Sequence, residues 1–170
     1  ASPVAQSATP NVPGLATTSQ LSSPAAGNEH TCIIRDTAVW CSGTNSRGQL
    51  GTGTLTKSIA FAPTLMTNAV QVSAGAYSTC AVKTDALLLD RTVWCWGVGN
   101  NGQLGDGTKT NSILPVPARI DSVISVDVGL AHTCAVRSTG SVWCWGSNQY
   151  HRLGLRSSAS KTIPTYVPKV

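Results

Sequence analysis

Short apolar segments separated by turn-forming residues make up most of this chain. The segments are rich in valine, isoleucine, threonine and tryptophan, and glycine, asparagine, serine or aspartate bounds them, as in antiparallel hairpins. In the clearest case, residues 134–137 run into a turn at 138–140 and return over 141–144, with Gly140 supplying the positive φ of a tight turn. The pattern therefore predicts an all-β protein built from short hairpins.

This hairpin is apolar on both faces. Because side chains alternate along a strand, Val142 and Cys144 share one face and Trp143 and Trp145 take the other. A free-standing antiparallel sheet would have one polar face, so both faces of this one need cover. Stacked sheets provide it, and we expect the tryptophan side to pack against one neighbouring sheet and the cysteine side against the other.

The same landmarks occur three times in the same order. Val39-Trp40-Cys41 returns at 93–95 and 142–144, and Gly48-Gln49-Leu50-Gly51 returns at 102–105 and, altered, at 151–154. A period of about 50 residues matches a β-propeller blade. We divide the chain into an uncharged Pro/Ser/Thr/Ala arm, three repeats each opened by a proline-led strand, and the opening strand of a further repeat. These segments span 1–28 for the arm, 9–62, 63–114 and 115–163 for the repeats, and 164–170 for the extra strand.

Six cysteines fall at matching positions, two in each repeat. Each pair lies on adjacent strands of one hairpin, where facing Cβ atoms come within bridging distance. We therefore predict three disulfides, Cys32–Cys41, Cys80–Cys95 and Cys134–Cys144. Such bonds persist in oxidising compartments, which favours a secreted or cell-surface protein. The cysteine spacing differs from that of zinc modules, and Ser78 stands where the other repeats have His30 and His132, so we expect no metal.

Charge is sparse and unevenly placed. Only 11% of residues are charged, and much of the net charge of +5 lies after Tyr150, where four cations have no acidic residue among them. They are Arg152, Arg156, Lys161 and Lys169. A basic end of this kind suits nucleic acid, an anionic glycan or an acidic protein, and it also suits a plain solvated surface. The case for nucleic acid is thin, because few aromatic residues accompany the cations.

The start of the chain and its hydropathy bear on location. Ala1-Ser2-Pro3 is typical of a mature terminus left after removal of a signal peptide, and a recombinant truncation would look the same. No apolar run approaches the roughly 18 residues of a membrane-spanning helix. We expect no membrane span.

The repeat resembles that of the regulator of chromosome condensation family. Its fullest copies here are Gly129–Val136 for the first portion and Val93–Thr108 for the middle portion, and the resemblance covers roughly residues 9–170. The cysteine-bearing form is similar to secreted bacterial members. The resemblance implies β-propeller blades of four antiparallel strands, commonly seven in a closed ring. Three repeats cannot close such a ring, so we expect an incomplete propeller or one completed by oligomerisation.

Departures from the repeat mark the candidate binding residues. Ser42 stands where the other repeats have Trp96 and Trp145, and the last loop exchanges turn glycines for cations, so that loop has either relaxed or acquired a contact. The middle hairpin carries an insertion whose three leucines either fold back on their own blade or form an exposed contact finger. The candidate residues are Leu87, Leu88, Leu89, Tyr150, His151, Arg152 and Arg156.

No catalytic constellation is recognisable. The seven acidic residues are scattered singly, and His30 and His132 occupy equivalent repeat positions, which favours a structural role. Phosphate-binding, serine-hydrolase and zinc-protease motifs are absent from the sequence. We expect a protein that is not an enzyme and carries no cofactor.

Three functions fit these observations. The ring faces of this family bind proteins, and some secreted relatives inhibit enzymes in this way, so the first is a secreted module that binds a protein or glycan through blade loops. The second is a structural subunit that assembles head-to-tail, because open blade faces would otherwise be exposed. The third is a fragment of a longer, closed propeller.

Overall fold

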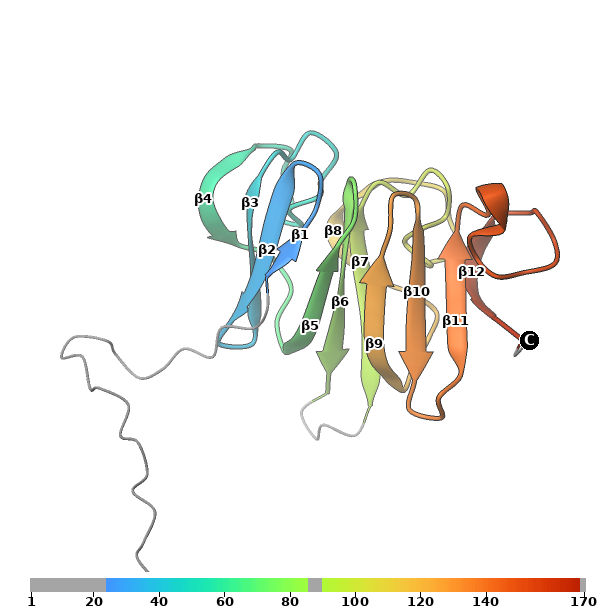
Figure 1. The fold of residues 1–170 in the computed structure, drawn as a ribbon. Helices are drawn as coiled ribbons and strands as arrows, with labels where there is room; N and C mark the ends of the chain where they lie inside the picture. The colour runs from blue at the N-terminus through green and yellow to red at the C-terminus, as the bar shows by residue number, and fades with distance from the viewer. Residues whose placement is uncertain (1–23, 86–89, 169–170) are drawn as a thin grey trace, which may run out of the picture.

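The computed structural model describes residues 24–85 and 90–168, which form three four-stranded antiparallel sheets standing side by side (Figure 1). The first blade contains β1 (Ala25–Ala26), β2 (His30–Arg35), β3 (Ala38–Gly43) and β4 (Ser58–Pro63). The second contains β5 (Ala69–Ala74), β6 (Ser78–Thr84), β7 (Arg91–Gly97) and β8 (Ser112–Pro117). The third contains β9 (Val123–Val128), β10 (His132–Arg137), β11 (Val142–Gly146) and β12 (Lys161–Tyr166), with a 3₁₀ turn at Gln149–His151. The expected all-β fold of three propeller-type blades is confirmed, and the propeller is not closed.

The central hairpin of each blade is held by a disulfide between directly opposed residues. Cys32 faces Cys41, Cys80 faces Cys95 and Cys134 faces Cys144 across their strand pairs. The Cα atoms of each pair are 4.1 Å apart, and all three pairs are bonded in the predicted combination. Gly140 has a φ of 79°, as the hairpin turn of the third blade requires.

The proline-led strands take a different place from the one expected. Instead of opening each repeat, the prolines lie in the fourth strand of the preceding sheet, with Pro63 as the last residue of β4. Pro63 lies opposite Trp40, Pro117 opposite Trp94, and Tyr166 opposite Trp143. Residues 164–166 of the segment predicted to open a further repeat therefore end the last strand of the third blade, β12. Proline fits there because an edge strand has amide groups without a neighbouring strand to bond.

The predicted uncharged arm also ends earlier than expected. Ala25 and Ala26 pair with Cys32 and Thr31 as β1, so the last residues of the segment 1–28 belong to the first sheet. The proline-led segment expected to open the first repeat near residue 9 lies outside the described residues.

We call the side of each blade that carries the disulfide its cysteine face and the other side its tryptophan face. The blades stack with the cysteine face of one against the tryptophan face of the next. Cys32 and Cys41 of the first blade share a buried cluster with Trp96 of the second. Cys80 and Cys95 of the second blade share another with Trp145 of the third. The predicted packing of the two faces against different neighbours is confirmed. In the described chain, the tryptophan face of the first blade and the cysteine face of the third have no blade against them.

Candidate functional site

Each of the first two blades sends a glycine-rich loop onto the next blade. The main-chain carbonyl of Gln49 accepts hydrogen bonds from the Thr79 hydroxyl and the Trp96 indole N–H, both at 2.9 Å. The carbonyl of Gln103 accepts the same pair from Thr133 and Trp145, again at 2.9 Å. The two interfaces between blades therefore repeat one set of contacts, and the loops at 48–53 and 102–107 are buried against the next blade by these contacts.

Glycine is required in these loops because they lie against the backbone of the next blade. Gly48 has a φ of +82°, and a Cβ added there would lie 2.8 Å from the Cα of Ile113. Gly102, with a φ of +83°, stands in the same relation to Thr162. Three residues past each glutamine–leucine pair, the N–H of Gly53 donates to the Ile113 carbonyl at 3.1 Å and that of Gly107 to the Thr162 carbonyl at 2.9 Å. These bonds fasten each loop to the fourth strand of the next blade.

The corresponding loop of the third blade, residues 149–157, keeps the internal fold of the others. The Asn148 side chain accepts from the Leu153 N–H at 2.9 Å, as Asn45 accepts from Leu50. Leu153 is buried, like Leu50. The buried frame of this third-blade loop is thus shared with the first blade, and what differs is its outer surface.

That outer surface carries the four predicted binding residues of the loop. His151 replaces the first glycine, Arg152 the glutamine and Arg156 the last glycine. Tyr150 is 83% exposed, and Tyr150 and His151 both have positive φ, at 60° and 55°. Positive φ costs energy for a bulky residue, so the chain holds these two side chains outward against their backbone preference.

Arg152 makes its contacts within the loop. Its guanidinium carbon lies 5.8 Å from the centre of the Tyr150 ring, and its Nε donates to the Gln149 carbonyl at 2.9 Å. In the part of the chain that the structure describes, the ion pairs are Arg35–Asp36 and Arg137–Asp121, and neither uses an arginine of this loop. The positive charge of the loop is therefore not neutralised by an acidic partner within the described chain.

The loop borders the uncovered cysteine face of the third blade. Burial, followed by the charge of Arg152, lowers the pKa of His132 on that face, whereas Asp127 raises it. Val142 is 39% exposed, while its equivalents Val39 and Val93 are fully buried under the next blade. This exposure marks the same surface that is covered in the first two blades.

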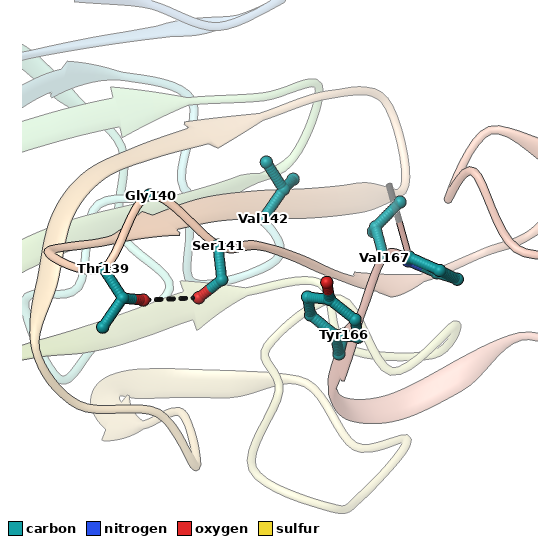
Figure 2. A pocket seen from close by; sticks show the side chains of 7 residues that line it. Thr139, Gly140, Ser141, Val142, Tyr166 and Val167 are labelled. Atoms are coloured by element: carbon teal, nitrogen blue, oxygen red, sulfur yellow. Dashed lines mark hydrogen bonds between the residues drawn. The ribbon is translucent and has the colours of Figure 1, made fainter. Parts of the chain in front are cut away.

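A pocket of about 430 Å³ lies beside the turn between β10 and β11. It is lined by the hairpin turn 139–142 and by Tyr166, Val167 and Pro168 at the end of β12 (Figure 2). Figure 2 also shows the 2.9 Å hydrogen bond between the Thr139 and Ser141 hydroxyls at its edge. The pocket was not foreseen from the sequence, although Tyr166 in the position of Pro63 and Pro117 was an available signal.

Of the predicted binding residues, the structure brings Tyr150, His151, Arg152 and Arg156 together in one loop. Leu87, Leu88 and Leu89 lie outside the described residues. Among the residues described, none of the His, Cys, Asp and Glu side chains gather into a group that could hold a metal ion. The described part also contains no helix with the length and apolarity needed to cross a membrane.

Comparison with known proteins places these blades. Family models of the regulator of chromosome condensation (RCC1) repeat match residues 36–82, 90–136 and 139–170, and a second model of the same repeat matches 123–152. The human E3 ubiquitin-protein ligase HERC2 is 36% identical over 77 residues, which are 42% of this chain and 2% of that protein. The mouse X-linked retinitis pigmentosa GTPase regulator is 32% identical over 108 residues, 59% of this chain and 10% of that protein.

The solved structure of human WBSCR16 is similar to this chain with a TM-score of 0.73 and 22% identity, covering 88% of this chain and 40% of that one. The β-propeller domain of the Trilobed protease from Pyrococcus furiosus is similar with a TM-score of 0.51 and 9% identity, covering 90% and 44%. The chain thus spans less than half the length of these proteins. At these identities, the likeness concerns the fold.

Proposed function

Because this chain belongs to the regulator of chromosome condensation (RCC1) repeat family, we propose that it is an extracellular, non-catalytic module that binds an acidic protein through the third-blade loop. Repeats of this family commonly mediate protein interactions.

One observation carries the proposal. The loops of the first two blades are consumed in holding the next blade, through the carbonyls of Gln49 and Gln103. The third-blade loop has the same buried frame, but it presents an exposed tyrosine and two arginines that lack an ion-pair partner in the described chain. A rigid frame that displays aromatic and arginine side chains is the composition of a protein-binding hot spot.

The extracellular location is supported by the disulfides. Each blade has one, and all six cysteines are used. Bonds of this kind form and persist mainly in oxidising compartments. In the cytosol such bonds are rare, because thiols are kept reduced there.

The non-catalytic role is supported by what the titratable groups do. His30 sits between blades and bonds to the Thr79 hydroxyl at 2.8 Å. Asp121 pairs with Arg137 on the surface. Both side chains are thus engaged in contacts that hold the fold.

Self-assembly head-to-tail is the second candidate. The exposure of Val142 and the pocket beside it favour some cover for the cysteine face of the third blade. A second copy would have to approach past His151, however.

Affinity capture from the extracellular fluid of the source organism tests the proposal. The bait is the full chain, compared with a Tyr150→Ala/Arg152→Ser/Arg156→Ser variant and with a control that loses the same charge at the exposed Lys57 and Lys109. We expect acidic proteins captured by the wild type and the control, and lost with the loop variant. Equal capture by all three would overturn the proposal, and release by heparin alone would point instead to an anionic glycan.

A further inference from the structure

We infer that His151 prevents the third blade from stacking on another blade of this repeat, and so keeps the chain from assembling head-to-tail. The inference stands independently of the proposed partner, because self-association and partner capture are separate measurements. It rests on the two interfaces between blades within this chain, which show what a third such interface would need.

The first blade offers much of the required receiving surface. Thr31 occupies the position of Thr79 and Thr133, whose hydroxyls bond to the loop of the preceding blade. Ile59 occupies the position of Ile113, because Ser58 lies opposite Gly43 as Ser112 lies opposite Gly97. Ile59 is 98% exposed and Ile113 is 38% exposed. The difference reflects the loop that covers Ile113 and is missing over Ile59.

The third blade offers much of the matching surface. His132 is the counterpart of His30, whose Nε2 lies 2.8 Å from the Thr79 hydroxyl of the next blade. Gly154 keeps the place of Gly51, where a Cβ would lie 2.7 Å from the indole nitrogen of Trp96. The carbonyl of Arg152 stands where that of Gln49 accepts two hydrogen bonds. The Thr31 hydroxyl of a second copy could therefore bond to His132 and to this carbonyl of the first copy.

His151 breaks the match at the backbone. At the equivalent Gly48, a Cβ would come 2.8 Å from the Cα of Ile113 and 2.9 Å from the Ser112 carbonyl oxygen. In a second copy, those atoms belong to Ile59 and Ser58 of β4, a strand held by its pairing with β3. His151 carries a Cβ and a ring at this point, so a blade cannot approach in the geometry that the chain uses elsewhere.

The other two departures from the repeat weaken the same contact without blocking it. The N–H groups of Gly53 and Gly107 fasten their loops to the next blade, and both glycines have positive φ. Arg156 stands at the equivalent position and is not among the non-glycine residues with positive φ in the described chain. Ser42 replaces the indole that fills the other interfaces. Losing the fastening bond and the indole lowers affinity, whereas His151 forbids the approach.

Rebuilding the interface separates these effects. The variant Ser42→Trp/His151→Gly/Arg156→Gly restores the repeat at all three positions, and Ser42→Trp/Arg156→Gly restores it everywhere except at the block. Light scattering over a wide concentration range measures the mass of each. We expect the wild type and the blocked variant to stay monomeric, and the mass of the rebuilt variant to rise with concentration. Adding His132→Ala to the rebuilt variant should reduce its association severalfold.

The opposite substitution places the block inside the chain. Gly102→His should lower the thermal unfolding midpoint more than Gly140→His, because both glycines have φ near +80° but a Cβ at Gly140 meets nothing within 4 Å. Equal shifts for the two variants would overturn the inference. So would a self-associating wild type, a blocked variant that associates as well as the rebuilt one, or a rebuilt variant that remains monomeric.

Discussion

His30 of the first blade and Thr79 of the second are joined by a buried hydrogen bond of 2.8 Å between Nε2 and Oγ1. The Thr79 hydroxyl gives its own hydrogen to the Gln49 carbonyl, so the imidazole must be the donor through Nε2–H. Its Nδ1 is buried without a hydrogen-bond partner. A second proton would have to sit there without an acceptor, and burial lowers the pKa of His30 to about 4.

Stability should therefore fall in mild acid because of His30. The unfolded chain binds a proton as the pH drops below about 6.5, while the folded chain resists until its pKa of about 4, so the free energy of unfolding is full above pH 6.5 and declines below it. Between pH 7 and pH 5 the loss should be about 2 kcal/mol from this residue. Urea denaturation of wild type and His30→Gln at both pH values checks this. The same pH dependence in both proteins would contradict the assignment.

The two threonines at the interfaces between blades should contribute different amounts to the free energy of unfolding. Thr79→Val removes two hydrogen bonds and leaves the buried imidazole donor unpaired, at an expected cost of about 2–3 kcal/mol. Thr133→Val removes one bond and should cost about 1 kcal/mol, because Ser78 stands in the histidine position there. The Gln49 and Gln103 carbonyls keep their tryptophan donors in both variants. Equal free energies of unfolding for the two variants would show that His30 adds nothing to its interface.

The disulfides should stabilise each blade separately. Cys80 and Cys95 are separated by 15 residues, so the chain-entropy estimate gives about 3 kcal/mol for that bond. The Cys80→Ala/Cys95→Ala pair should lose this much in urea denaturation. Peptide mapping of the non-reduced wild type should recover three bonds within blades. A bond between cysteines of different blades would refute the pairing.

The two-residue alternation of side chains along the strands predicted much of this architecture. Alternation of side chains along a hairpin was enough to place Cys144 and Trp145 on opposite faces and to pair Cys134 with Cys144. Sequence order could not say whether the strand ending at Pro63 joins the sheet before it or after it, because an edge strand has the same composition in both. The steric block at His151 could not be predicted from the sequence either, since it depends on how close Gly48 comes to the Ile113 backbone in space.

The loop itself was found from the sequence for a simple reason. The residues that replace its glycines depart visibly from the repeat. The sequence alone therefore indicated Tyr150, His151, Arg152 and Arg156. The open faces were expected from the count of three repeats, but Val142 could not be singled out, because it matches Val39 and Val93 in sequence and differs from them only in lacking a blade above it.

Photo-crosslinking from position 150 tests the central claim most directly, since Tyr150 is the most exposed aromatic of the third-blade loop. A photoreactive aromatic amino acid is placed at Tyr150, and at Leu114 on β8 as a control, and each protein is irradiated in the extracellular fluid of the source organism. The account predicts a crosslink from position 150, but not from position 114, to an acidic protein other than this chain. A crosslinked dimer of the chain, or the same products from both positions, would contradict it.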